Sequence, residues 1–225
     1  MADQESGFAQ ELREATKSDH DGTGTSTYMS ALFDGRLGRE QYAALVAQLH
    51  PVYDLLEQAA DRMSGDPVAG AFALDGLSRR DALEADLAFL YGPDWRDRID
   101  RIDRDAGLQA TRRYCDRLRE VCFDWPGGFV AHHYTRYLGD LSGGQYMGVQ
   151  VRKILGLAAG EDGVRFYRFP GAPKTFKEQY RALLDAAPWD EVERARIVDE
   201  VKRAYRLNAE ITAELGHVLD IEPAA

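Results

Sequence analysis

Apolar and small residues recur every three or four positions along most of the chain, with charged residues between them. From Phe8 to Thr16 this spacing predicts an amphipathic helix that ends near His20, just before the glycine-broken stretch 21–26. Strict alternation of apolar and polar residues, which is typical of a strand, is almost absent. The pattern therefore predicts an all-α protein.

The same pattern predicts further helices along the rest of the chain. Pro51 lies inside one long segment and should kink it. Residues 164–173 instead have a short extended character and two prolines. No repeat or low-complexity linker is present, so we expect a single domain with roughly eight helices. The expected helical segments are 26–37, 38–63, 78–92, 107–125, 128–155, 173–190 and 189–219.

Length and charge narrow the class of protein. The 225 residues, 44% of them hydrophobic, suffice for one large domain with a core. The net charge of −10 argues against nucleic acid as the main partner. We expect no membrane span, because no apolar run reaches about eighteen residues, and no secretory signal. Cys115 and Cys122 are seven apart in one expected helix, which disfavours a disulfide and points to free thiols in a reducing cytoplasm.

The stretch YLGDLSGGQYMG, residues 137–148, contains the letters LSGGQ, which are spelled like the signature of ABC-type ATPases. Such an ATPase also needs a phosphate-binding loop, G-x-x-x-x-G-K-[ST], after a strand. The dipeptide Gly-Lys does not occur in the chain, and no strand–helix–strand pattern surrounds the stretch. The resemblance to a nucleotide signature is therefore discarded.

The glycines of this stretch need another explanation. Each glycine inside a helix costs about 1 kcal/mol relative to alanine, so four cost roughly 3–4 kcal/mol. Close helix packing is one interpretation, and a flat wall for a ligand is the other. The neighbouring Arg136 and Asp140 favour a ligand site over a core. The four residues are Gly139, Gly143, Gly144 and Gly148, of which the first two share one helix face.

Other candidate residues are a histidine and a basic pair. His20 ends the first expected helix, where its side chain can point into a pocket. His132 and His133 are adjacent, so they face different ways and cannot both bind one metal. Lys177 and Arg181 are four apart on one helix face, where like charges repel unless an anion lies between them.

Several long motifs resemble one family. FVAHHYTRYLGDLSGGQ, residues 129–145, resembles the distal-helix signature of heme oxygenases, and LREATKSDH, residues 12–20, resembles their proximal helix. FYRFPGAPKTFKEQYRALLD (166–185) and LNAEITAEL (207–215) resemble C-terminal blocks of the family. The likeness covers nearly the whole chain. It implies one helical heme oxygenase domain over residues 1–225, with an ordered core of about 6–217, that holds heme b between the proximal and distal helices.

The resemblance also implies roles for individual residues. His20 matches the axial iron ligand, and Asp140 matches the aspartate that orders distal waters. Gly139 and Gly143 match the glycines that let the distal helix approach heme and its bound oxygen. The polar residues of the same water network are matched by Tyr53, Arg136 and Asn208, and the groups that hold the heme propionates by Arg13, Tyr134, Lys177 and Arg181.

The implied activity is oxidative cleavage of heme to biliverdin, with release of CO and Fe²⁺. Heme is then both cofactor and substrate, and O₂ is the second substrate. No flavin or nicotinamide fingerprint is present, so we expect electrons from an external donor, a reductase system of the ferredoxin or flavodoxin type. A candidate docking patch is the arginine cluster of residues 112–119, although an ordinary charged helix face explains it equally well. Its members are Arg112, Arg113, Arg117 and Arg119.

Two residues differ from the family pattern, and two other functions are also compatible with the sequence. Gly24 stands where relatives often have a glutamate that hydrogen-bonds the axial histidine, and Asp19, Asp21, a carbonyl or water could replace it. Arg13 stands where lysine is usual. A heme carrier or sensor that does not degrade its ligand is one alternative. The other is a helical interaction protein that uses the glycines only for packing.

Overall fold

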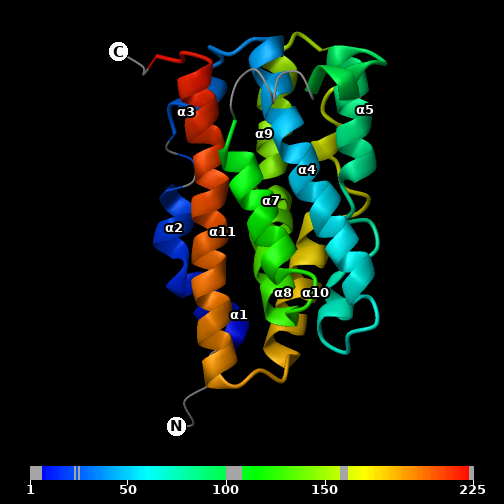
Figure 1. Ribbon diagram of the computed structural model, residues 1–225, viewed down its shortest axis with the longest axis vertical. Helices are drawn as coiled ribbons and strands as arrows, with labels where there is room; N and C mark the ends of the chain where they lie inside the picture. Colours follow the sequence, from blue (N-terminus) through cyan, green and yellow to red (C-terminus); the bar gives the residue numbers. More distant parts are fainter. Residues whose placement is uncertain (1–6, 23, 25, 100–107, 158–161, 223–225) are drawn as a thin grey trace.

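The computed structural model describes residues 7–22, 24, 26–99, 108–157 and 162–222, and these are helical or irregular, without a strand. Most of the longer helices run close to the long axis of the molecule (Figure 1). The all-α prediction is confirmed. The α-helices are α1 (Phe8–Ala15), α2 (Lys17–Gly22), α3 (Thr27–Phe33), α4 (Arg39–Met63), α5 (Arg80–Tyr91), α7 (Ala110–Val121), α8 (Pro126–His133), α9 (Gln145–Ile154), α10 (Pro173–Ala186) and α11 (Glu191–Val218).

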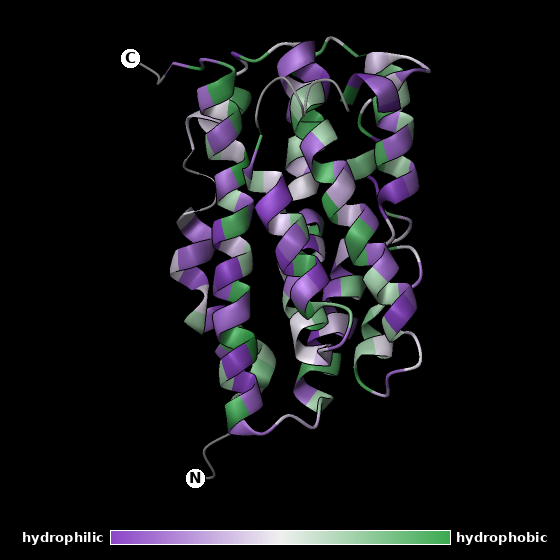
Figure 2. Cartoon of the chain, in the orientation of Figure 1, coloured by the Kyte–Doolittle hydropathy of each residue, from purple (hydrophilic) through white to green (hydrophobic). Residues whose placement is uncertain are grey.

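Two long helices organise the core. Helix α4 packs against α5, α7 and α8, and α11 packs against α7, α8 and α3. Figure 2 shows hydrophobic and hydrophilic residues alternating along each helix, as expected where one face is buried. Burial of each large apolar side chain stabilises the fold by about 1.5–3 kcal/mol. Helix α4 continues through Pro51, and Asp190 caps α11 by accepting a hydrogen bond from the Glu193 N–H.

The first expected helix is divided in two. Thr16 ends α1, is buried, and donates its hydroxyl to the Leu12 carbonyl at 2.7 Å. The chain then restarts as α2, which carries His20 and packs against α11. The hydroxyl of a threonine competes for backbone partners in this way, a local effect that apolar spacing does not report.

The long helix expected over residues 128–155 is continuous, but its middle is widened. Between α8 and α9 lie two π-helical turns, η2 (Tyr134–Leu138) and η3 (Asp140–Gly144). Such turns are rare and often mark functional sites. The extended character expected for 164–173 is confirmed only in part: Arg168 and Ala172 have extended backbone, but the segment also contains the 3₁₀ turn η4 (Arg165–Tyr167).

Candidate active site

A cavity of about 430 Å³ opens between the N-terminal helices and the π-helical turns. One side is formed by α1 and α2, the other by η2 and η3, and α10 and α11 complete it. The sequence-predicted residues His20, Arg13, Tyr134, Lys177 and Arg181 all line this cavity, as does Gly139. The remaining lining residues are Ala9, Thr16, Lys17, Asp21, Leu138, Ser142 and Tyr205.

His20 stands on the α2 side of the cavity, and its side chain is 57% exposed. Its Nδ1 lies 3.3 Å from Asp21 Oδ1, and its ring meets the Tyr205 ring edge-on with centroids 5.8 Å apart. A carboxylate at one ring nitrogen orients the ring and leaves Nε2 as the nitrogen suited to metal binding. Asp21 therefore contacts His20 and can take the place of the glutamate that is missing at Gly24.

The four glycines of the distal stretch fall into two pairs with different purposes. A Cβ placed on Gly139 or Gly143 would meet no atom within 4 Å. A Cβ on Gly148 would lie 2.9 Å from the Tyr167 Cβ, and one on Gly144 would lie 3.3 Å from the Tyr167 ring. The packing interpretation therefore holds for Gly144 and Gly148. Within the described residues, nothing packs on Gly139 and Gly143, so their bare backbone forms an open wall.

Asp140 stands beside this wall in a hydrogen-bonded network. The Tyr53 hydroxyl donates to Asp140 Oδ2, and Arg136 Nε donates to the Tyr53 oxygen at 3.0 Å. Arg136 Nη1 donates to Asn208 Oδ1, while its Nη2 lies 3.8 Å from Asp140 Oδ1. The structure thus brings together the four residues that the sequence assigned to the distal network. They come from α4, the two π-helical turns and α11.

Burial sets the protonation of this network. It raises the pKa of the Tyr53 hydroxyl well above its ordinary value, against the opposing charge of Arg136, so Tyr53 keeps its proton and donates it. Burial also raises the pKa of Asp140, while Arg136, the hydrogen bond from Tyr53 and Arg79 lower it. Opposing effects of burial and of neighbouring groups therefore set the pKa of Asp140, as is common for groups that transfer protons.

Four cations line the cavity: Arg13, Lys17, Lys177 and Arg181. Burial raises the pKa of Tyr134, and the nearby Arg181 and Arg13 lower it, so both guanidinium groups act on the Tyr134 hydroxyl. Lys177 of α10 and Lys17 of α2 line the same cavity. Among the described residues, no carboxylate forms an ion pair with any of these four cations. In a chain of net charge −10, four such cations at one cavity suit an anionic ligand.

The comparisons with known proteins agree with this geometry. A sequence model of the heme oxygenase family matches residues 6–214. The chain belongs to the heme oxygenase family. Heme oxygenase 1 of Rattus norvegicus is 37% identical over 218 residues, which cover 96% of this chain and 73% of the rat protein. Heme oxygenase 2 of Synechocystis sp. is 36% identical over 217 residues, which cover 94% of this chain and 84% of that protein.

Solved heme oxygenase structures share the fold. Heme oxygenase-1 of Synechocystis sp. in complex with heme has a TM-score of 0.86 at 33% identity, covering 96% of this chain and 95% of that one. Heme oxygenase-2 of the same organism, in complex with heme and NO, has a TM-score of 0.85 at 34% identity, covering 96% and 87%. The alternative of a protein that only packs helices is therefore wrong.

The cavity fits the heme group of this family. Heme is flat and carries two propionate anions, and the bare backbone of Gly139 lines the cavity, with the open position Gly143 one helical turn further on. The cations line the same cavity from α1, α2 and α10, where they suit the propionates, and His20 faces the cavity from α2. No described helix is both long enough and apolar enough to cross a membrane.

Sequence reasoning missed several lining residues. Lys17 lies one turn before His20, so its helical spacing could have identified it. Ser142 lies between the wall glycines. Leu138 and Tyr205 are apolar or aromatic residues on long helices, and nothing in the sequence separates them from ordinary core positions.

Proposed function

We propose that this heme oxygenase binds its substrate between α1–α2 and the turns η2 and η3, with the residues of the cavity in the roles below. The enzyme cleaves heme oxidatively to biliverdin, CO and Fe²⁺, and heme is both its substrate and its cofactor. The observation that carries the assignment of roles is the open wall of Gly139 and Gly143 beside the buried Asp140. We also assign residues 1–225 to one domain.

His20 is the residue that we propose would hold the heme iron. Its Nε2 would bind the iron, while Asp21 accepts a hydrogen bond at Nδ1 and fixes the neutral tautomer that ligation needs. Tyr205 packs edge-on against the ring and limits its rotation. Arg13, Tyr134, Lys177 and Arg181 would hold the propionates, and so fix the rotation of the macrocycle within the cavity.

The distal residues control proton delivery. When bound, heme supplies the iron at which O₂ is reduced and the ring that is opened. The bare backbone at Gly139 and Gly143 leaves room for that chemistry and restricts it to one side of the ring. Asp140 would hold a water through Oδ1, while Tyr53 fixes Oδ2 and Arg136, held by Asn208, keeps the carboxylate oriented. The water, rather than the carboxylate, then donates the proton.

Electrons come from an external donor, which we propose to be an acidic ferredoxin or flavodoxin in the cytoplasm. Three of the four α7 arginines are poor candidates for its docking site, because each already pairs with a carboxylate. Arg113 pairs with Glu210 at 2.9 Å, Arg119 pairs with Asp116 at 2.9 Å, and Arg117 pairs with Glu200.

One assay separates an oxygenase from a carrier. Hemin is added to the protein until a Soret band is complete, and a reductant is then supplied in air. We expect the band to bleach with formation of biliverdin and CO. A band that persists under these conditions would identify a heme carrier. For the site, His20→Ala should lose the six-coordinate spectrum while an otherwise matched surface variant, His217→Ala, retains it; unchanged spectra in both would remove His20 from its role.

A further inference from the structure

Arg79 is a buried cation outside the cavity. It immediately precedes α5, is only 4% exposed, and stacks its guanidinium over the Phe169 ring at 4.0 Å. Its side chain donates to backbone carbonyls: Leu77 at 2.8 Å, Gly76 at 3.0 Å, Phe166 at 3.4 Å, and Arg168. In the part of the chain that the structure describes, it forms no ion pair with a carboxylate. Carbonyl dipoles satisfy its side-chain N–H groups without neutralising its charge, and Glu57 of α4, which accepts the backbone N–H of Arg79, is a nearby carboxylate that acts on this charge.

Arg79 holds the segment 165–168 through two of these carbonyls. This segment lies directly behind the hydrogen-bonded network of Asp140. Asp86 of α5 accepts hydrogen bonds from the backbone N–H groups of Arg165 and Phe166, at 2.9 Å each. Two N–H groups of this segment are therefore held by Asp86, and two of its carbonyl groups by Arg79. The Phe166 ring packs edge-on against the Tyr53 ring, with centroids 5.1 Å apart. Since Tyr53 donates to Asp140, Arg79 is connected to Asp140 by three contacts, through Phe166 and Tyr53.

We propose that Arg79 is a positioning residue for heme cleavage, which supplies the Asp140 carboxylate with a second positive charge from behind the distal helix. Arg136 is the first such charge, within 3.8 Å of Asp140. A charge in a water-poor interior acts over a longer distance than one at the surface, because little solvent screens it. The inference rests on the proposed role of Asp140.

The electrostatics of the neighbouring groups support the proposal. Arg136 and Arg79 are the two cations that lower the pKa of Asp140, and Asp140 in turn raises the pKa of Arg79 against the lowering effect of burial. The ionisable groups that act on Asp140 or feel its charge come from several elements: Tyr53 of α4, Arg136 and Tyr137 of η2, Tyr114 of α7, Tyr167 of η4, and Arg79. The tyrosines remain neutral, so the two arginines carry the positive charge.

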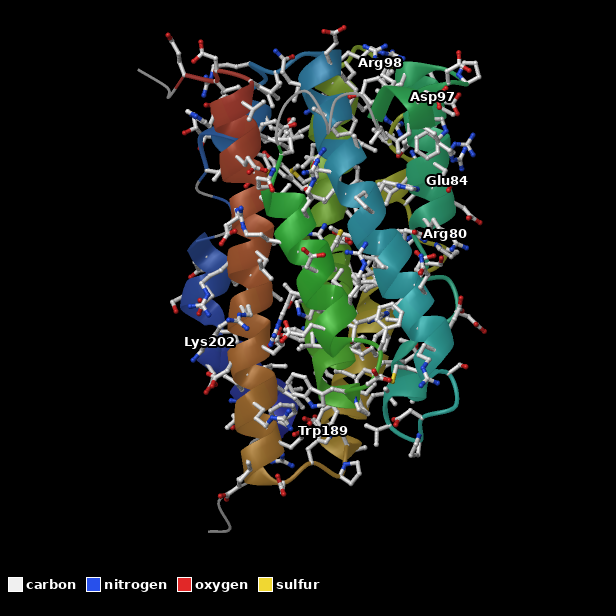
Figure 3. The ribbon with its side chains drawn as sticks, in the orientation of Figure 1. Arg80, Glu84, Asp97, Arg98, Trp189 and Lys202 are labelled. Carbon is white, nitrogen blue, oxygen red and sulfur yellow. The ribbon has the colours of Figure 1, made fainter. Side chains whose placement is uncertain are left out.

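The test is the pKa of Asp140 in the heme-free protein, measured by ¹³C NMR of its side-chain carboxyl. Arg79→Met should shift that pKa upward, because it removes one of the two cations. Arg79→Lys keeps the charge with fewer hydrogen bonds, so it should leave the pKa near the wild-type value even though the Tm falls. Arg80→Met is the matched control, because it removes the same charge from the neighbouring residue. Arg80 stands at the outer edge of α5 (Figure 3).

An unshifted pKa in Arg79→Met would overturn the proposal. If Arg79→Met does not fold, an upward shift in Arg79→Lys would overturn it, since the charge is still present. In the loaded enzyme, the acid limb of the pH profile for heme cleavage should move to higher pH in Arg79→Met and stay in place in Arg80→Met. A shifted pKa with an unmoved profile would also reject the role in cleavage. The role of Asp140 itself is tested separately, by turnover of Asp140→Asn.

Discussion

The division of the distal glycines gives a pair of substitutions with different consequences for stability. Gly139 has ordinary helical angles, φ −60° and ψ −50°, and an added Cβ there meets no atom within 4 Å. Alanine should therefore gain about 1 kcal/mol of helix propensity without a clash. Gly148→Ala gains the same amount, but its Cβ would lie 2.9 Å from the Tyr167 Cβ. Overpacking of this kind costs about 1–3 kcal/mol.

The propensity gain is common to both variants and cancels in their comparison. The heme-free Gly139→Ala protein should therefore exceed Gly148→Ala in unfolding free energy by about 1–3 kcal/mol. For a chain of this size, the corresponding difference in Tm is about 2–12 °C. Guanidinium unfolding of the two heme-free proteins measures the difference directly.

The rate of heme cleavage should follow the opposite order, with Gly148→Ala faster than Gly139→Ala. The methyl group of Gly139→Ala projects into the space proposed for heme, where a displacement of about 1 Å can lower the rate on the order of 10²-fold. Gly148→Ala faces Tyr167 and should retain most of its turnover. The assay is the bleaching of the Soret band during reduction in air. If Gly139→Ala is as unstable as Gly148→Ala, or cleaves heme at the wild-type rate, the open-wall interpretation is wrong.

Further outcomes follow from the same contacts. Asp140→Ala should bind heme and lose most ring cleavage; full turnover at the wild-type rate would contradict its role. Arg181→Ala should weaken heme binding roughly tenfold or more, since hydrogen bonds to a charged group contribute about 1.5–3 kcal/mol, and should leave the Tm of the heme-free protein unchanged. Glu200→Gln should lower stability by about 3–5 kcal/mol, because it leaves the buried His132 without its carboxylate and leaves the half-buried Arg117 with Glu120 as its remaining partner. Burial opposes ionisation of Glu200, but Arg117 and His132 outweigh it and lower its pKa from 4.5 to about 2, so this stability is present above pH 4.5 and disappears as the pH falls to 2. Equal acid denaturation curves for wild type and Glu200→Gln would contradict that assignment.

Helix positions were predictable because the apolar spacing is regular. The expected segments 38–63 and 78–92 correspond to α4 and α5 within a few residues. The free, buried state of Cys115 and Cys122 is confirmed. His132 and His133 also face different partners, Glu200 and Tyr180 respectively.

The π-helical turns were not predictable, because they depend on which tertiary partners hold the backbone. Arg136 and Asp140 of these turns bond to Tyr53 and Asn208, which are far away in sequence. The two uses of the glycines were equally hidden. Only the position of Tyr167 against α9 shows that Gly148 packs, whereas Gly139 does not.

The resemblance to heme oxygenases, rather than helical spacing, indicated which candidate residues would lie together. Helical spacing alone placed Lys177 and Arg181 on one face, but it gave no indication that Arg13 on α1 would join them at one cavity. The same holds for Asp21, whose contact with His20 depends on the short helix α2. Arg79 carried no sequence signal, since a buried arginine bound by carbonyls looks like any charged residue at the start of a helix.

The central claim is that heme lies against the bare backbone of the distal turns, with its iron on His20. A crystal structure of the heme complex tests it most directly. We predict iron bound to His20 Nε2, Asp21 at Nδ1, the ring plane in van der Waals contact with the backbone of Gly139 and Gly143, and an ordered water on Asp140. Iron held by another side chain, or a ring bound away from Gly139 and Gly143, would contradict the account.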